Sequence, residues 1–275
     1  MSQPTIRLDH SRSTDDDELD LAVTAAQTTT LRSRIVGIWL APFGILALVA
    51  ALLLYYTSLD LATANIQQRS ALDWSTKLWP QTIEHLTIAF WATLLVIIVA
   101  VPLGILLTRP AFRGAAPWVL TVANSGQALP AYGLLILFLI LLGQGTGTVI
   151  WALALYALLP VLRNTMVGLD QVDRATIEAG RGMGMTKRQA LTRIELPLAV
   201  PVNIAGVRTA TIINIGMATL AFLVGGGGLG ITINSGLKLQ QNEVLIVGAV
   251  MVAIVALTFD WLGAVAERYL KPRGL

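Results

Sequence analysis

Long apolar stretches that carry no charge restrict what this chain can fold into more than any other feature. The first covers about residues 35–56, and a helix of about 20 such residues crosses a bilayer core of about 30 Å. Only 13% of the residues are charged, roughly half the share typical of a soluble domain. A chain of 275 residues with this balance is expected to be an all-α, polytopic membrane protein.

Six apolar segments recur along the sequence, which predicts about six transmembrane helices. They cover about residues 35–56, 83–107, 117–142, 147–162, 198–224 and 244–264. The fourth segment is short for a full crossing, so we expect neighbouring protein to shield one of its ends. Residues 35–275 are therefore interpreted as one membrane domain.

The amino-terminal residues 1–34 differ from the rest of the chain. They are polar and include an acidic run at residues 15–18, and they lack the basic and apolar parts of a signal peptide. A disordered, solvated tail is the favoured interpretation, and an interaction tail is the alternative.

The basic residues predict how the spans are oriented. With six spans and both termini in the cytoplasm, only Arg69, Lys77 and Lys238 of the 19 lysines and arginines fall on the outer side, and Arg208 lies within a span. Basic loops of membrane proteins remain on the cytoplasmic side. This rule places residues 163–196 in the cytoplasm, where ATP is available.

The third apolar segment is interrupted by polar residues and a proline. Asn124 and Gln127 lie shortly before Pro130, which cannot donate a backbone hydrogen bond. Polar side chains at membrane depth face a water-filled path or join helices by hydrogen bonds, and the pattern leaves both open. Tyr132, just after the break, and Asn214 in the fifth segment are further candidates for a translocation path. A packed or interfacial tyrosine is the alternative for Tyr132.

A basic, glycine-punctuated stretch separates the fourth and fifth apolar segments. Residues 178–197 read EAGRGMGMTKRQALTRIELP. The glycines at 180, 182 and 184 predict a break between two short helices, and a plain basic linker is the alternative. Four apolar residues fall on one face of the first helix: Val172, Ala175, Ala179 and Met183.

The ends of these two short helices have recognisable caps. Asp170 or Asp173 could begin the first helix. Thr186 and Gln189 have the form of a capping box, which would begin the second. Pro197 is expected to end it.

This stretch resembles the EAA loop of permease subunits of ABC importers. The family pattern is Glu-Ala-Ala, three residues, glycine, nine residues and Ile-x-Leu-Pro. Here Glu178, Ala179 and Gly180 are followed at the same spacings by Gly184 and by Ile194 to Pro197. The departure is Gly180 in place of the second alanine. The resemblance implies the type I ABC importer permease fold, in a plasma membrane of the bacterial inner-membrane type.

The same resemblance implies several partners. The loop would carry a coupling helix that docks on a cytoplasmic ABC ATPase dimer, which binds the ATP, so no cofactor is expected in this chain. Further partners would be a second permease copy or a related permease, an extracytoplasmic substrate-binding protein and membrane lipid, with no nucleic acid. The residues assigned to ATPase coupling are Glu178, Ala179, Gly180, Gly184, Met185, Ile194, Leu196 and Pro197.

Two further stretches resemble the permeases of osmoprotectant importers, which take up glycine betaine, carnitine or choline. They are IAGVRTAT at residues 204–211 and GGGGLG at residues 225–230. For the glycine run, the resemblance favours a bend near the outer gate over a plain flexible turn. An aromatic face such as that of Tyr132 suits a quaternary ammonium cation. Permeases of methionine or other amino-acid importers are the runner-up.

Other functional classes find less support in the sequence. It has no cysteine and two histidines, no phosphate-binding G-x-x-x-x-G-K-[ST] loop and no paired carboxylates, so we expect neither an enzyme nor a metal site. An ion-driven secondary transporter would need an ionisable group at mid-membrane, and Asp260 is the acidic candidate. Arg208 is expected near the cytoplasmic end of its span, where it can reach the interface or pair, and not to bind a cationic substrate.

Overall fold

In the computed structural model of the chain, residues 39–61 and 63–270 are described. The predicted tail, residues 1–34, lies outside them. The chain divides into two units, Met1–Gly44 and Ile45–Leu275, and every contact that follows lies within the second. The described residues form helices and turns and no strand, which confirms the all-α prediction.

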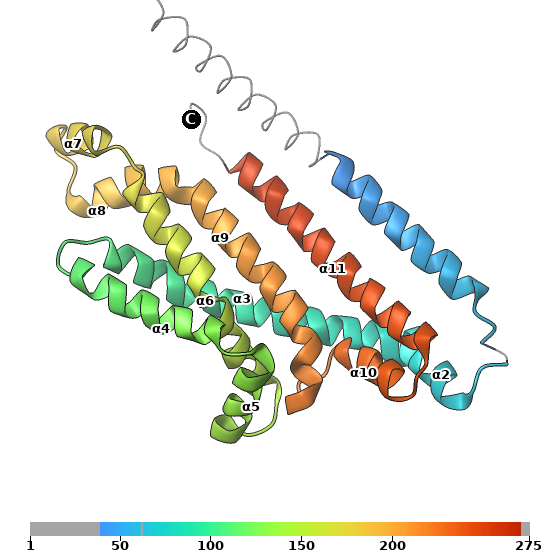
Figure 1. Cartoon of the computed structure of the whole chain (residues 1–275). Helices are drawn as coiled ribbons and strands as arrows, with labels where there is room; N and C mark the ends of the chain where they lie inside the picture. Colours follow the sequence, from blue (N-terminus) through green and yellow to red (C-terminus); the bar gives the residue numbers. More distant parts are fainter. Residues whose placement is uncertain (1–38, 62, 271–275) are drawn as a thin grey trace, which may run out of the picture. The chain divides into compact units, whose positions relative to one another are not determined.

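The helices follow one another with short connections (Figure 1). The helix Trp39–Ser58 comes first. It is followed by α2 (Ile66–Ala71), the π-helical turn Trp74–Leu78, α3 (Trp79–Leu107), the turn Arg113–Ala115, α4 (Ala116–Ala128), α5 (Ala131–Leu142), α6 (Thr146–Asp170), α7 (Arg174–Gly182), α8 (Lys187–Ala190), the π-helical turn Leu191–Glu195, α9 (Leu196–Met217), the 3₁₀ segment Ala218–Val224, α10 (Gly230–Lys238) and α11 (Asn242–Tyr269).

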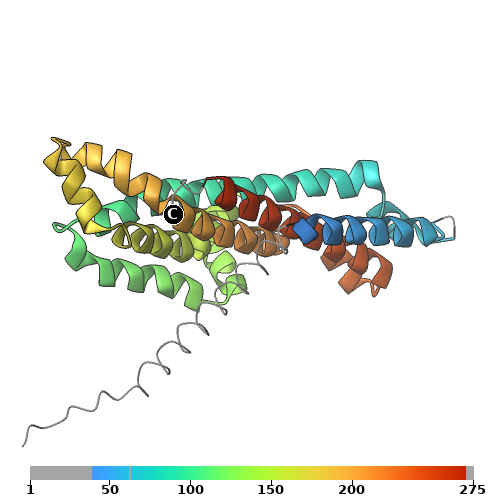
Figure 2. The ribbon, with the colours of Figure 1, turned by 90° about the horizontal axis from the view of Figure 1, so that it is seen from above.

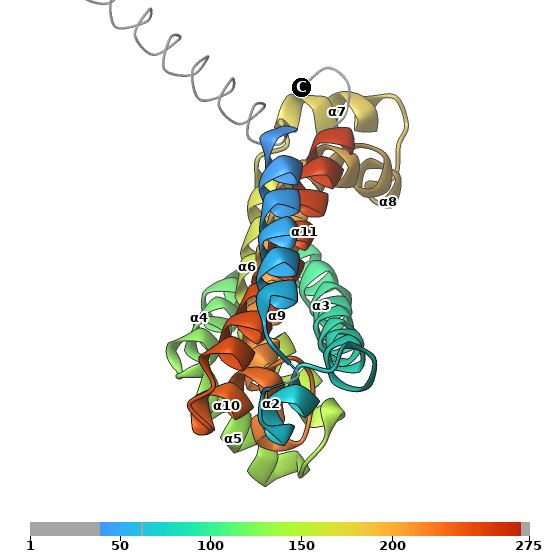
Figure 3. The ribbon, with the colours of Figure 1, turned by 90° about the vertical axis from the view of Figure 1, so that its right-hand side faces the viewer.

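The long helices separate two ends of the bundle. In Figures 1 and 3, α7 and α8 lie at one end, and α2, α5 and α10 lie at the other. Figure 2 shows the same separation, with the yellow α7 segment and the cyan α2 segment at opposite ends. The loop that resembles a coupling element is therefore remote from the glycine-rich run, which precedes α10.

The helices agree in number with the sequence prediction. Five helical stretches of the described chain are long and apolar enough to span a membrane, and there are six if α4 and α5 count as one broken span. These two helices meet at a bend of 102°. Leu129 is extended at the bend, because the residue before a proline disfavours the helical region. The predicted interruption at Pro130 is confirmed.

The fourth span is longer than the sequence prediction. We expected a short segment at about residues 147–162, whereas α6 covers 25 residues, Thr146–Asp170. The helix continues past Arg163 because its far end packs on α9. Thr165 is fully buried, and a Cβ on Gly168 would lie 3.2 Å from the Ala199 carbonyl oxygen. Packing against neighbouring helices therefore extends α6 beyond the apolar segment from which its length was predicted.

Pro197 does not end a helix, contrary to the prediction. It lies in the first turn of α9, where its missing N–H needs no intrahelical partner. The π-helical turn Leu191–Glu195 joins α8 to α9 without a break, and its wider turn is closed by the Leu196 N–H donating to the Leu191 carbonyl. The same arrangement occurs at Trp79, where a π-helical turn precedes Pro80 at the start of α3.

Helix α6 lies at the centre of the described bundle and packs against α3, α4, α5 and α9. Small residues allow the close approach. A Cβ on Gly104 of α3 would lie 2.7 Å from Thr165 Cγ2, and a Cβ on Gly206 of α9 would lie 2.7 Å from Asn164 Cβ. Glycine at these two crossings lets the backbones of α3 and α9 lie directly against α6.

Candidate coupling loop and translocation path

The loop between α6 and α9 folds as a small helical hairpin. Asp173 caps α7, where its carboxylate accepts from the Ala175 N–H at 3.1 Å. Thr186 and Gln189 form the predicted capping box at the start of α8. Between the helices, Gly184 has a φ of +93°, a conformation that costs glycine little and other residues much more. The two short helices and the break are therefore confirmed.

The inner side of the hairpin is formed by three residues of the predicted coupling set. Gly180 is buried, and the Ile194 side chain covers it so closely that a Cβ at position 180 would collide with Cδ1. The Met185 N–H donates to the Gly180 carbonyl at 3.2 Å. Gly180, Met185 and Ile194 thus hold α7 against the turn that leads into α9. Gly180 stands where the family pattern has alanine, and the Ile194 side chain fills the space that the alanine methyl group would occupy.

The outer side of α7 has no partner in the described part of the chain. Glu178 and Ala179 are exposed, and Met183 is 76% exposed. Glu178 forms no ion pair with any residue of the ranges 39–61 and 63–270. Three of the four apolar residues predicted to share a face of this helix, Ala175, Ala179 and Met183, therefore face outward beside the Glu178 carboxylate.

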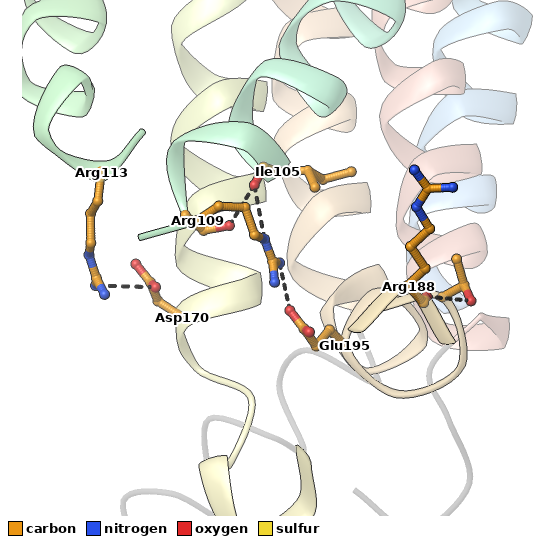
Figure 4. A network of polar contacts seen from close by, with 8 residues as sticks. Ile105, Arg109, Arg113, Asp170, Arg188 and Glu195 are labelled. Atoms are coloured by element: carbon orange, nitrogen blue, oxygen red, sulfur yellow. Dashed lines mark hydrogen bonds and ion pairs between the residues drawn. The ribbon is translucent and has the colours of Figure 1, made fainter. Parts of the chain in front are cut away.

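Two ion pairs attach the hairpin and its flanking helix to the preceding part of the chain (Figure 4). Arg109, in the turn after α3, donates to Glu195 at 2.6 Å, and the Glu195 side chain is only 9% exposed. Arg113 pairs with Asp170 at the end of α6 at 3.4 Å, and both side chains are about half exposed. Glu195 occupies the variable position of Ile-x-Leu-Pro, so the motif did not point to it.

Two of the four residues predicted to line a path have a bonded partner in another helix. Gln127 donates to the Tyr156 carbonyl at 3.0 Å. That carbonyl lies four residues before Pro160, which has no N–H to offer it. Gln127 on α4 thereby satisfies a backbone group of α6. This contact favours the helix-joining alternative for Gln127.

Asn214 also joins helices. It is fully buried and lies 3.0 Å from Thr93 Oγ1 of α3. With its amide oxygen toward Thr93, the amide nitrogen also donates to the Leu153 carbonyl of α6 at 3.1 Å. Asn124 and Tyr132 are different, because both side chains are exposed. These two remain predicted path residues.

A bidentate ion pair connects α9 and α11. Arg208 Nε and Nη2 donate to the two carboxylate oxygens of Asp260 at 2.6 Å and 2.8 Å, and Glu267 lies 3.7 Å from the same guanidinium. Gly263 leaves space for the arginine, since a Cβ there would lie 2.9 Å from Arg208 Cγ. Pairing was one of the two alternatives for Arg208. Asp260 is therefore occupied and is not a free mid-membrane carboxylate.

The glycine-rich run forms a tight bend at the end of the bundle opposite α7. Gly225, Gly227 and Gly228 have positive φ values. A Cβ on Gly230 would collide with the Thr219 carbonyl oxygen. The bend predicted for residues 225–230 is present, and glycine is required by close backbone contacts. No three His, Asp or Glu side chains in the described ranges lie close enough to hold a metal ion.

Comparison with known proteins decides the family. The sequence family described as "Binding-protein-dependent transport system inner membrane component" matches residues 100–273. The chain belongs to this family. The permease is thus a subunit of a membrane transport system that works with a binding protein, and the family is not one of enzymes.

Several curated relatives cover most of the permease. It is 47% identical over 195 residues to the "Choline transport system permease protein OpuBB" of Bacillus subtilis, which spans 71% of this chain and 89% of the relative. It is 47% identical over 195 residues to the "Glycine betaine/carnitine/choline transport system permease protein OpuCB" of the same organism, with the same coverage. It is 43% identical over 189 residues to the "Osmoprotectant import permease protein OsmY" of Salmonella typhimurium, covering 69% of this chain and 80% of the relative.

Solved structures confirm the fold. An inward-facing structure of the MetNI methionine ABC transporter matches with a TM-score of 0.62 at 23% identity, and the match covers 71% of the permease and 96% of that chain. An amino acid ABC transporter matches with a TM-score of 0.58 at 19% identity, covering 69% and 92%. The expected type I ABC importer permease fold is confirmed.

Proposed function

We propose that this permease subunit forms the translocation path of an ABC importer for a quaternary-amine osmoprotectant such as glycine betaine. The observation that carries the proposal is the high identity to permeases named for choline, glycine betaine and carnitine. The likeness to the methionine transporter is at 23% identity, so it supports the shared fold and not a methionine substrate.

Coupling is assigned to the loop from Glu178 to Pro197. The exposed face of α7 carries Ala175, Ala179 and Met183 beside Glu178, which forms no ion pair within the described residues. It offers an apolar and acidic surface to a separate protein. An exposed apolar surface that no described residue covers marks a protein–protein contact. The partner is an ABC ATPase dimer, which supplies the ATP. The buried side of the hairpin, Gly180 against Ile194, makes the loop a single unit that the ATPase can move.

The orientation follows from the basic loops. With six spans and with α7 and α8 in the cytoplasm, the positive-inside rule favours a cytoplasmic location for both chain termini. The end of the bundle that carries α2, α5 and α10 then faces outward (Figures 1 and 3). A substrate-binding protein would deliver its ligand to that end. A second copy of the chain or a related permease completes the path, with membrane lipid around it.

The substrate class is tested by uptake into cells that lack their own osmoprotectant importers. The permease is expressed with its ATPase and binding protein, and uptake of labelled glycine betaine, choline, carnitine and methionine is compared. We expect uptake of at least one quaternary amine that stops when ATP is depleted. Uptake of methionine alone would contradict the substrate class. Uptake that persists without ATP and follows an ion gradient would contradict the ABC assignment.

A further inference from the structure

A carboxylate is held by the glycine-rich bend at the end of the bundle opposite the coupling loop. Glu84, near the start of α3, accepts a hydrogen bond from the Gly228 N–H at 2.9 Å through Oε2. Gly227 has a φ of +80°, and a Cβ at that position would lie 2.5 Å from the same oxygen. Glycine at position 227 lets the backbone adopt this left-handed conformation and leaves room for the carboxylate where it lies.

The charge of Glu84 is not neutralised by the described part of the chain. Glu84 is exposed, and it pairs with no lysine, arginine or histidine of residues 39–61 and 63–270. Its carboxylate borders an open recess of about 300 Å³, which is also lined by Thr87, Thr146 and the backbone of Gly225–Gly227. This volume lies at the lower end of the roughly 300–1,000 Å³ typical of small-molecule sites.

The recess lies far from the coupling loop. Thr146 is the first residue of α6 and Asp170 the last, and a helix of this length separates its ends by about 36 Å at about 1.5 Å per residue. In the proposed orientation, the recess is at the outer end of the bundle, where a binding protein would release its substrate.

We propose that Glu84 and the Gly225–Gly228 bend form an entry site for the cationic head of a quaternary amine. This inference rests on the proposed function. A quaternary ammonium group has no N–H to donate, so it is recognised by charge and shape. Glu84 suits this task because one oxygen is anchored to the Gly228 N–H while the carboxylate faces the recess. Thr87 and Thr146 line the recess with polar groups. Because the Glu84 carboxylate is already held by the Gly228 N–H, less conformational entropy is lost when it binds the cation.

The charge of the substrate provides the test. Choline is a monocation, whereas glycine betaine also carries a carboxylate that Glu84 would repel. Glu84→Gln removes the charge but keeps an oxygen that can accept from the Gly228 N–H. We expect it to raise the KM for choline uptake about tenfold, the equivalent of about 1.4 kcal/mol, with a smaller change for glycine betaine. Glycine betaine uptake by the same variant shows that the variant is folded.

Two matched variants separate charge from structure. Glu243→Gln removes a carboxylate from the first turn of α11, at the same end of the bundle but outside the recess, and should leave the KM for choline unchanged. Glu84→Ala removes both the charge and the hydrogen bond, so it should impair both substrates.

The outcomes distinguish this site from the proposed function. An unchanged KM for choline in Glu84→Gln would overturn the entry site, as would equal losses for the two substrates, which would indicate a role in holding the bend. If the wild-type importer took up neither compound, the proposed substrate class would be wrong and the entry site would be wrong with it.

Discussion

The guanidinium of Arg109 and the carboxylate of Glu195 lie 2.6 Å apart, joining the turn after α3 to the last residue before α9 (Figure 4). Glu195→Gln should destabilise the permease by about 1–3 kcal/mol, because it removes the charge of the nearly buried carboxylate that accepts from Arg109. The melting temperature of the purified protein measures this loss.

A second ion pair at the same end serves as the control. Asp170→Asn breaks the pair with Arg113, in which both partners are about half exposed, and should change stability by less than about 1 kcal/mol. A double-mutant cycle with Arg109→Ala and Glu195→Ala should then give a coupling energy of about 1 kcal/mol or more. A coupling energy near zero would mean that the close contact stabilises nothing.

Gly180 and Ile194 should show coupled effects. Gly180→Ala improves helix propensity by up to about 1 kcal/mol, but the new Cβ would meet Ile194 Cδ1. Ile194→Val removes that atom, so Gly180→Ala should be more favourable in the Ile194→Val background than in the wild type. Melting temperatures of the four proteins measure the difference. Equal effects in both backgrounds would show that Ile194 moves aside without cost.

Gly230 should tolerate no side chain. A Cβ there would collide with the Thr219 carbonyl oxygen, a backbone atom that cannot rotate away. Gly230→Ala should cost on the order of 3 kcal/mol or more and reduce the yield of monodisperse protein in size-exclusion chromatography. Gly216→Ala is the matched control, because nothing lies within 4 Å of a Cβ at that helical position. Similar yields of the two variants would contradict the close contact.

Asp260 is expected to stabilise the folded permease by pairing with Arg208 and not to carry an ion during transport. Asp260→Asn removes the bidentate partner of Arg208 and leaves Glu267 at 3.7 Å, so we expect a loss of about 1–3 kcal/mol. Glu267→Gln should cost less. A normal melting temperature combined with a lost response of uptake to the proton gradient would instead support an ion-driven transporter.

Local patterns account for what could be predicted from the sequence. An uncharged apolar run, the Thr186–Gln189 capping box and the break at Pro130 each depend on a few neighbouring residues. Contacts between distant segments could not be predicted in this way. Arg109 and Glu195 are 86 residues apart, and neither lies in a pattern that specifies its partner.

The helix boundaries illustrate the same limit. The fourth apolar segment stops at a charged residue, Arg163, but α6 continues because Thr165 and Gly168 pack on neighbouring helices. The sequence predicts that Pro197 ends a helix, but it lies in the first turn of α9, and the π-helical turn before it joins α8 to α9 without a break. Gln127 could have been placed only by knowing that α4 lies beside the Tyr156 carbonyl.

Docking of the Glu178 loop on an ATPase is the central claim, and co-purification tests it most directly. The tagged permease is isolated in a gentle detergent together with its ATPase, beside Glu178→Lys and the control Glu243→Lys, which reverses a charge at the opposite end of the bundle. Glu178 is exposed and unpaired in the described chain, so reversal should leave the melting temperature unchanged. We expect Glu178→Lys to reduce the retained ATPase about tenfold, or about 1.4 kcal/mol of binding, and Glu243→Lys to retain it. Equal amounts of ATPase with wild type and Glu178→Lys, both coupled to ATP-driven uptake, would contradict the claim.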